Sequence, residues 1–365
     1  MAITTIGTNS PQAVKRWGLA LADDIGKQSY FTRFTGEGSN NIIEKKVDLE
    51  TVQGDSIKFD LMMRMRGAPT YGDNIIVGNE EELKYFQDEV KIDQVRKAGS
   101  AGGAMSQKRT IRDLRQNARQ LTGEYLSEWL DEGFFVYLSG DSTFGAINQD
   151  AKFATTFAGN AVTAPDADHI MYGGAATSKA SLTATDKMTA QLIERAAVKT
   201  DMLNSVNPDV VRMSPVTAEG EKVFVMLMSP FQQYDLRTEV GDLSWSKIAQ
   251  AAMASEGRMS PVFKGGLGKI ANVVLHSHAS VRRFNNYGAG QNVAAGRALL
   301  LGRQAGVVAY GKAGNGTRMK WVEESADAGN LINIYCGMIT GFKKTVFNNK
   351  DFGVIAIDTA CKDPN

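Results

Sequence analysis

The segment at residues 306–317, GVVAYGKAGNGT, nearly matches the glycine-rich loop that binds nucleotide phosphates. Two of its glycines and Lys312 have the required spacing, but Ala313 stands where a Ser or Thr hydroxyl would bind magnesium. A working loop also needs a helix that begins at the lysine, so that its free amide groups face the phosphate. Asn315 and Gly316 instead favour a turn, and the residues after them alternate as in a strand. We therefore interpret the spacing as accidental and expect no nucleotide site.

Three other short patterns could do chemistry. His276 and His278 would face the same way on a strand, as half of a metal site, but nothing brings a third ligand such as His169 close to them. The segment KDFGV at 350–354 contains the DFG triplet of protein kinases, yet no His is followed by the Arg-Asp of a catalytic loop. Cys336 lies in an apolar run and is interpreted as a core residue. We expect no enzyme activity, no metal and no cofactor.

The composition is that of a core-forming protein with no strong charge. The 365 residues predict two or three lobes, at ~100–200 residues per domain. Lys and Arg number 41 against 40 Asp and Glu, so generic nucleic-acid binding is not favoured. Two cysteines cannot build a disulfide framework, and no apolar run approaches the ~18 residues of a membrane span. The start of the chain lacks the order of a signal peptide, so no membrane association or export is expected.

The first 100 residues predict an arm and a long hairpin. Residues 1–9 have no pattern, and a helix with a Ser10 cap is expected to follow them. Alternating apolar residues at 57–65 predict a strand, which glycines and a proline interrupt between 67 and 72. A second stretch with strand character, 81–99, would complete an extended hairpin. A two-stranded ribbon is marginal alone in water, so we expect a neighbouring subunit to support it.

The strongest predicted element is a single helix from Gln107 to about Tyr137, on the order of 45 Å long. Its apolar residues recur every three or four positions and predict one buried stripe. The members of this stripe are Ile111, Leu114, Ala118, Leu121, Tyr125 and Trp129.

The charges of this helix are segregated in a way that opposes the helix dipole. The two groups are Lys108, Arg109, Arg112, Arg115 and Arg119 in the first half, and Glu124, Glu128, Asp131 and Glu132 in the second. Two interpretations stay open. The charges form a solvated face, or the basic half meets either acids of a neighbouring copy or packaged DNA.

The rest of the chain predicts a mixed second lobe. A helix is expected at 186–203, and apolar strands at 209–216, 222–230 and 269–277, with a helical segment at 244–255. Two or three strands joined by an Asn-rich turn are expected at the C-terminus. The pattern predicts that this second lobe mixes helices and strands.

Five stretches then follow one another across roughly residues 40 to 360. They are GAMSQKRTIRDLRQNARQLTGEYLSEWLDE, GNAVTAPDADHIMYGG, VFVMLMSPFQQYDLR, RALLLGRQAGVVAYG and ITGFKKTVFNNKDFGVIAIDT. As an ordered set they resemble the major capsid proteins of N4-like tailed phages, which have the HK97-type capsid fold. No single motif is specific by itself.

This resemblance implies an α+β, HK97-like architecture of five parts. Residues 1–44 would be an N-terminal arm, and 45–104 a projecting β-hairpin called the E-loop. Residues 105–210 would form a peripheral domain with a long spine helix. Residues 211–329 would form an axial domain, and 330–365 would return as strands that complete the peripheral domain.

The resemblance also implies a structural function. Copies would form pentamers and hexamers of an icosahedral phage head around double-stranded DNA, after assembly in the host cytoplasm. Further expected partners are a decoration or cement protein, a scaffold and a portal, with only non-specific proximity to DNA. No catalytic residue or covalent cross-link is carried over.

We name nine candidate contacts between subunits or with DNA. They are Arg109, Arg112, Arg115, Arg119, Glu124, Glu128, Asp131, Pro69 and Tyr71. Two alternatives from other classes remain at this point: a soluble two-lobe ligand-binding protein or enzyme, and a minor structural component of a virion.

Overall fold

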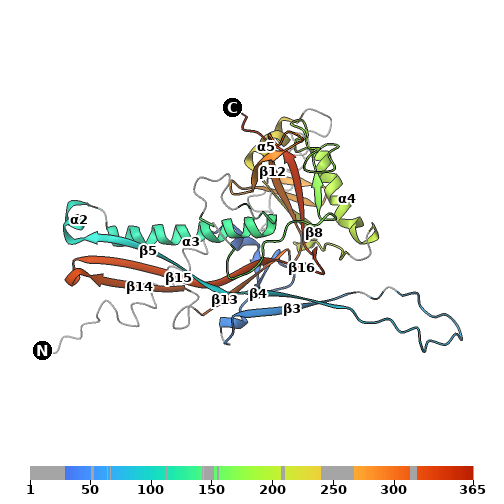
Figure 1. Ribbon diagram of the computed structural model, residues 1–365, viewed down its shortest axis with the longest axis horizontal. Helices are drawn as coiled ribbons and strands as arrows, with labels where there is room; N and C mark the ends of the chain where they lie inside the picture. The colour runs from blue at the N-terminus through green and yellow to red at the C-terminus, as the bar shows by residue number, and fades with distance from the viewer. Residues whose placement is uncertain are drawn as a thin grey trace.

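The computed structural model places two sheets in the body of the protein, with a two-stranded ribbon that projects from it (Figure 1). The helix expected after Ser10 and the helical segment at 244–255 lie outside the described residues, as does the Asn315–Gly316 turn. The described residues are 29–50, 53–63, 65, 67–111, 113–141, 143, 152–153, 156–206, 210–239, 267–312 and 319–364.

The first sheet is organised around its longest strand, β15. One edge of β15 pairs with β5, and its other edge pairs first with β14 and then with β13, all antiparallel. β2 and β1 extend the sheet beyond β13 in parallel. The strands are β1 (Thr35–Gly36), β2 (Ile43–Lys46), β5 (Asp93–Gly103), β13 (Gly306–Gly311), β14 (Met319–Ala326) and β15 (Leu331–Lys344).

The long helix α3 (Leu114–Ser139) packs across β5 and β15 (Figure 1). The prediction of one continuous helix from Gln107 is wrong, because a short helix α2 (Ala104–Arg109) ends before α3 begins. Asp113 starts the second helix: its carboxylate accepts from the amides of Arg115 and Gln116 at 3.0 and 3.1 Å. At the other end Gly140 takes a left-handed conformation (φ 64°), which stops the helix.

The predicted apolar stripe is correct only in part. Ile111 lies in the break between α2 and α3, and Leu121 points away from the sheet, so both are exposed. The other four members of the stripe pack into or against the main core. From Leu126 onward α3 is buried on nearly all sides, because other segments cover the face that does not meet the sheet.

The second sheet has eight strands in the order β6-β18-β12-β8-β10-β9, with β11 beside β12 and β7 beside β8. The helices α4 (Ala190–Val206), as predicted, and α5 (Pro230–Thr238) accompany it (Figure 1). Of the described residues 210–216 of the expected strand, only Val216 is in a strand. The strands are β6 (Ile170–Tyr172), β7 (Val216–Ala218), β8 (Glu221–Met228), β9 (Gly268–Ile270), β10 (Val273–Ser277), β11 (Arg283–Tyr287), β12 (Val293–Leu301) and β18 (Val354–Ala360).

The projecting ribbon consists of β3 (Ser56–Met62) and β4 (Tyr85–Lys91), paired antiparallel along their whole length. Its base is fixed to the body. Lys343 forms an ion pair with Asp88, and the Asn160 side chain exchanges two hydrogen bonds with the Lys91 backbone at 2.8 and 2.9 Å. The predicted hairpin is thus present, anchored at one end only. A smaller ribbon, β16 (Val346–Phe347) with β17 (Lys350–Asp351), contains the predicted Asn-rich turn.

The sheets do not follow the expected boundaries between parts of the chain. β13 and β14 were expected in an axial domain at 211–329, but they lie in the six-stranded sheet because both pair with β15. β18 belongs to the eight-stranded sheet, where it pairs with β12, although 330–365 was expected to complete the other domain. Only residues 56–91 of the expected 45–104 form the ribbon, because β2 and β5 are strands of the six-stranded sheet.

Aromatic side chains fill the space between α3 and β15. The ring of Phe342 lies 5.2 Å from the rings of both Phe134 and Tyr137, and 5.6 Å from that of Trp129. Gly133 permits this approach, because a Cβ there would lie 2.4 Å from the Phe342 ring. This contact fixes how closely α3 lies on the sheet.

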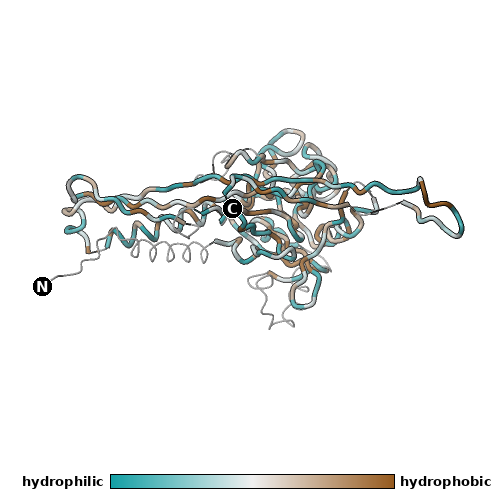
Figure 2. The backbone as a smooth tube through the Cα atoms, turned by 90° about the horizontal axis from the view of Figure 1, so that it is seen from below, coloured by the Kyte–Doolittle hydropathy of each residue, from teal (hydrophilic) through white to brown (hydrophobic). Residues whose placement is uncertain are grey.

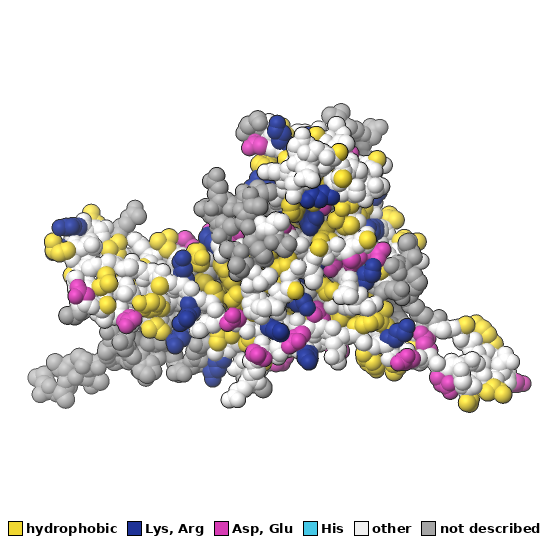
Figure 3. Space-filling model, in the orientation of Figure 1, with side chains coloured by type: hydrophobic (Ala, Val, Ile, Leu, Met, Phe, Trp, Pro, Cys, Tyr) yellow, Lys and Arg dark blue, Asp and Glu magenta, His cyan; other side chains and the backbone are white. Residues whose placement is uncertain are grey.

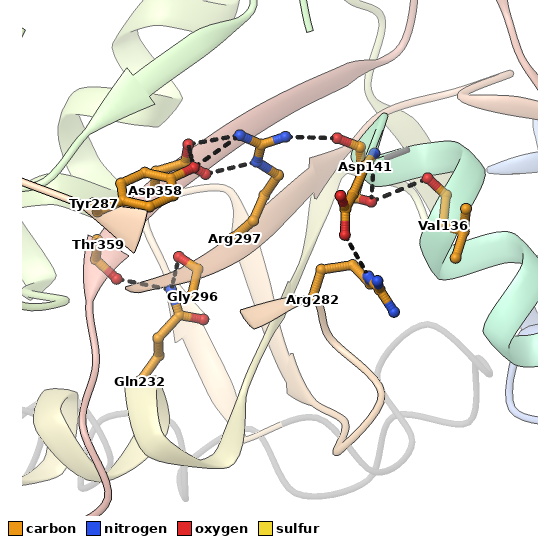
Figure 4. Close-up of polar contacts among 10 residues, drawn as sticks. Val136, Asp141, Gln232, Arg282, Tyr287, Gly296, Arg297, Asp358 and Thr359 are labelled. Carbon is orange, nitrogen blue, oxygen red and sulfur yellow. Dashed lines mark hydrogen bonds and ion pairs between the residues drawn. The ribbon is translucent and has the colours of Figure 1, made fainter. Parts of the chain in front are cut away.

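A buried arginine joins α3 to the eight-stranded sheet (Figure 4). Arg297 on β12 donates to both carboxylate oxygens of Asp358 on β18, at 2.7 and 2.8 Å, and to the Ser139 carbonyl at 2.9 Å. The Tyr287 hydroxyl donates to Asp358 at 2.7 Å and accepts from Arg297 at 3.0 Å. Beside it, Arg282 binds Asp141 at 2.8 Å. Burial alone would lower the pKa of Arg297, but the Asp358 carboxylate raises it above its ordinary value.

The described chain starts with a short segment that docks on α3. Asp131 accepts from the Ser29 hydroxyl at 2.8 Å and from the Tyr30 and Phe31 amides at 2.8 and 3.2 Å. These amides open the 3-10 helix η1 (Phe31–Phe34), which Asp131 therefore caps from another element. Burial raises the pKa of Asp131, although the three donors oppose this. Two further 3-10 helices are η2 (Asp48–Glu50) and η3 (Asp327–Gly329).

Replacing Arg297 by Met should strongly destabilise the subunit. The substitution leaves the Asp358 carboxylate buried without its countercharge, which typically costs about 3–5 kcal/mol. Arg212→Ala is a matched control, because the Arg212–Asp201 pair is exposed on both sides and should contribute at most about 1 kcal/mol. Urea unfolding of the unassembled subunits measures both. Equal effects of the two substitutions would contradict a structural role for the junction.

His278 should make the subunit less stable in acid. Its ring stacks on Phe135 at 5.0 Å and lies 4.6 Å from that of Tyr30. Burial, and then Arg33, lower its pKa from 6.5 to about 4, so the unfolded chain takes up the proton first. The free energy of unfolding is therefore not reduced by His278 above pH 6.5. It falls between pH 6.5 and about pH 4, by up to about 1.4 kcal/mol per pH unit.

The matched comparison for this prediction is His278→Phe, which keeps the ring packing and removes the titration. Unfolding free energies at pH 7, 6, 5 and 4.5 should fall more steeply for the natural chain than for the variant. Parallel curves would show that His278 does not titrate in this window.

Candidate assembly surfaces

The segment that resembles a phosphate loop is a strand. Gly306–Gly311 is β13, and its backbone pairs with β15 on one side and β2 on the other. Most of these backbone groups are thus used in the sheet and are not arranged to surround a phosphate. Lys312 follows the strand as an exposed residue. The prediction that the glycine spacing is accidental agrees with this geometry.

The two histidines of the His-Ser-His segment pack against aromatic rings. His276 is buried at the end of β10, with its ring 5.4 Å from that of Phe34. The nitrogen Nδ1 of His278 accepts from the Ser280 amide at 3.2 Å. Among the residues that the structure describes, no three His, Cys, Asp or Glu side chains are grouped to hold a metal ion.

Both cysteines, and Asp351 of the DFG segment, are buried. Burial raises the pKa of the Cys336 thiol to about 12 and that of Cys361 to about 11, so both stay protonated. Asp351 is buried against Lys344 at 2.7 Å, and the Phe352 ring packs on Phe347. Over the described part of the chain, no helix has the length and apolarity needed to span a bilayer.

The basic candidates of the long helix do not form one surface. Arg109 is exposed at the end of α2, and Arg112 lies outside the described residues. Arg115 binds Glu323 of β14 at 2.5 Å, so it joins α3 to its own sheet, and Arg119 is half-buried. Of the described basic candidates, Arg109 is the exposed one.

The acidic candidates likewise divide between surface and interior. Glu124 accepts from Gln120 one turn earlier, and the exposed Glu128 forms an ion pair with Lys152. Asp131 is buried and caps η1, so it is not available as a contact with another subunit. Its neighbour Glu132, also buried, accepts from the Lys152 and Phe153 amides.

The loop that closes the ribbon carries several exposed apolar side chains. We call residues 67–83 the hairpin tip. Its predicted contacts Pro69 and Tyr71 are exposed. Sequence reasoning missed Ile75, Ile76 and Val77, which are 76%, 65% and 78% exposed. Part of the backbone of the projecting hairpin is coloured as hydrophobic in Figure 2. The signal was present as an aliphatic run between two glycines.

A groove of about 430 Å³ lies on the six-stranded sheet. We call it the sheet groove. Met319 and Trp321 of β14 belong to the core against α3, so the alternate residues Lys320 and Val322 face the opposite side. Its lining is Gln94, Arg96, Lys97, Ala98, Lys320, Val322, Glu324, Tyr335, Cys336 and Gly337.

Comparison with known proteins agrees with this architecture. The model of the family described as phage capsid protein matches residues 5–363. The capsid of Ralstonia phage GP4 is 50% identical, with all of both chains covered and a TM-score of 0.85. The major capsid protein of Pseudomonas phage KPP25 is 26% identical over 381 residues, covering 97% of this chain and 96% of that protein.

A more distant structure shows the same fold. The capsid asymmetric unit of cyanophage Pam1 is 23% identical, with a TM-score of 0.71 over 92% of this chain and 93% of that one. The resemblance to capsid proteins is confirmed, whereas membership of the N4-like branch stays a prediction. The alternative of a two-lobe ligand-binding protein is set aside. The chain belongs to the phage capsid protein family, has the HK97-type fold and is a major capsid protein of a phage.

Proposed function

We propose that copies of this chain form pentamers and hexamers that close into an icosahedral head around double-stranded DNA, without catalysing a reaction. The observation that carries this proposal is the ribbon β3–β4, which is fixed to the body at its base and bears exposed aliphatic side chains at its tip. Such a ribbon is marginal alone, and exposed apolar patches mark interaction sites.

The parts of the fold take roles in the shell under this proposal. The six-stranded sheet with α3 is the peripheral domain, and the eight-stranded sheet with α4 and α5 is the axial domain around the capsomer axes. The ribbon is the E-loop. Contacts between different surfaces of identical subunits close into rings when the rotation between them allows it.

Further partners follow from the same role. A scaffold, a portal and a decoration or cement protein would act with this subunit, and assembly would take place in the host cytoplasm before the subunit becomes part of the virion. A near-neutral chain, with 41 basic and 40 acidic residues, suits a wall that lies close to DNA without binding it tightly.

Deleting residues 67–72 should leave a folded subunit that no longer closes shells. The deletion shortens an exposed loop and leaves the paired strands and their anchors intact. Light scattering and negative-stain microscopy measure assembly, and circular dichroism checks the fold. Shells of normal yield from this variant would contradict a role of the hairpin as a clasp between subunits.

Reversing the charge of α2 tests the remaining basic candidate. The double variant Lys108→Glu/Arg109→Glu should impair shells if α2 meets acids of a neighbour, or lower DNA content in normal shells if it faces DNA. Lys222→Glu/Lys362→Glu is the control, because both lysines are exposed elsewhere. Normal shells with normal DNA content would contradict both roles.

A further inference from the structure

The small ribbon β16–β17 contacts the projecting ribbon near the body, and it also contacts the turn that leads into β6. We call residues 345–352, which include β16, β17 and the turn between them, the bracket. We propose that the bracket holds the projecting ribbon at a set angle to the eight-stranded sheet, and that this angle keeps the curvature of the shell uniform. The part of the proposal that concerns the shell rests on the proposed function.

The bracket is a tight hairpin with a defined conformation. Its strands pair so that only Asn348 and Asn349 form the turn. Both asparagines have a left-handed backbone, with φ angles of 51° and 56°, as a two-residue hairpin turn requires. Just before β16, the ammonium group of Lys344 lies 2.7 Å from the carboxylate of Asp351, and both side chains are buried. The bracket is therefore rigid enough to fix its two neighbours relative to each other.

Both strands of the projecting ribbon meet the bracket at one cross-strand pair. Phe59 of β3 lies directly opposite Asp88 of β4, so their side chains point to the same face. The ring of Phe347 meets that of Phe59 edge-on, with 5.9 Å between the ring centres. The Asp88 carboxylate accepts a hydrogen bond from the Val346 amide at 3.1 Å, in addition to its ion pair with Lys343. The bracket thus binds β3 through an aromatic contact and β4 through a hydrogen bond.

The bracket is bound to the eight-stranded sheet through the carboxylate of Asp166. This carboxylate accepts from the Asp351 backbone amide at 2.8 Å and lies 2.8 Å from Nδ1 of His169. His169 is buried, and its carbonyl accepts from the Ala356 amide of β18 at 2.9 Å. Burial alone would raise the pKa of Asp166, but the hydrogen bonds with His169 and the Asp351 amide lower it, so the carboxylate stays charged. Hydrogen bonds therefore connect β18, through this carboxylate and the bracket, to the projecting ribbon.

The bracket supplies the second of two fixed points along β4. Asn160 holds Lys91 at the end of the strand, and the bracket contacts Asp88. These points lie about 10 Å apart, at ~3.4 Å per residue. One fixed point would allow the ribbon to pivot, whereas two set its direction. Figure 3 shows that the far part of the hairpin stands clear of the rest of the subunit, so a small change of angle at the bracket moves the tip a long way.

A uniform angle matters for the shell because identical subunits make the same contacts again and again. Such contacts close into a ring only when the rotation from one copy to the next is constant. If the ribbon took a range of angles, that rotation would vary between copies. Loss of the bracket contact should therefore give particles of variable diameter.

The distance between two spin labels measures the angle directly. Met62→Cys at the end of β3 and Val198→Cys on α4 place the labels at side chains that are 61% and 63% exposed, and both natural cysteines are buried. In unassembled subunits, Phe347→Ala should widen the distribution of label distances at least about twofold, because the ribbon loses its aromatic contact with the bracket. Phe347→Leu keeps an apolar side chain there and should leave the width close to that of the natural chain.

A matched control separates the bracket from a general loss of stability. Phe284→Ala removes a ring that is 9% exposed, against 7% for Phe347, but that ring lies in the eight-stranded sheet beside Tyr287. This control should leave the width of the distance distribution unchanged. An unchanged width for Phe347→Ala, or equal widening by Phe284→Ala, overturns the proposal.

Asp166→Ala tests the link to the eight-stranded sheet, because Asp166 binds the bracket and not the projecting ribbon itself. This variant should also widen the distance distribution. Glu221→Ala, which removes a partly exposed ion pair with Lys269, should not. Circular dichroism checks that each variant is folded. A folded Asp166→Ala variant with the natural width overturns the role of the bracket as a link between the two elements.

Particle diameters test the consequence for the shell. Shells of Phe347→Ala, viewed by negative-stain microscopy, should vary in diameter at least about twofold more than those of the natural chain. Shells as uniform as the natural ones, from a variant whose distance distribution has widened, overturn the role in curvature. If the natural chain forms no shells, the proposed function fails, while the label distances in unassembled subunits still decide whether the bracket fixes the ribbon.

Discussion

The guanidinium of Arg297 holds together the two halves of this subunit. It is bound at once by a carboxylate on the eight-stranded sheet and by the last carbonyl of the long helix. The helix in turn carries the six-stranded sheet through the aromatic contact between Phe342 and Phe134. The direction in which the sheet groove faces, relative to the eight-stranded sheet, therefore depends on a charge buried at the junction.

Some parts of the subunit have their polar and apolar groups satisfied within the same chain, and other parts do not. Asp131 illustrates the first kind, since three donors of the chain's first described residues converge on it. The hairpin illustrates the second. Its base is fixed by Asp88 and Asn160, while its tip exposes aliphatic side chains to water. A rigid base with an unsatisfied tip favours an ordered partner over non-specific association.

Much of the fold could be predicted from periodicity. The alternation at Ile57 and Phe59 correctly predicted a strand of the ribbon. The helical spacing from Leu114 to Trp129 correctly predicted most of the long helix. The break at Asp113 was predictable in principle as a helix cap, but a continuous apolar stripe concealed it. Acidic residues such as Asp131 and Glu132 look like surface residues in the sequence. Only folding brings close the backbone amides that donate hydrogen bonds to them.

The assembly surfaces were harder to predict. The run Ile75–Val77 resembles any short buried strand, because a sequence does not show that the surrounding loop projects from the body. The groove is harder still, since it is created by register: Gly337 lies between Arg96 and Lys320 only after strands more than 200 residues apart have paired. The sheets to which β13 and β18 belong were hard to predict for the same reason. Each is set by pairing with a strand that is distant in the sequence, β15 for β13 and β12 for β18.

The burial of the two thiols limits their reactivity. Cys336 and Cys361 are buried and protonated, and a thiolate is the form that exchanges disulfides or is oxidised. Disulfide exchange or oxidation at these two thiols is therefore disfavoured in the folded subunit.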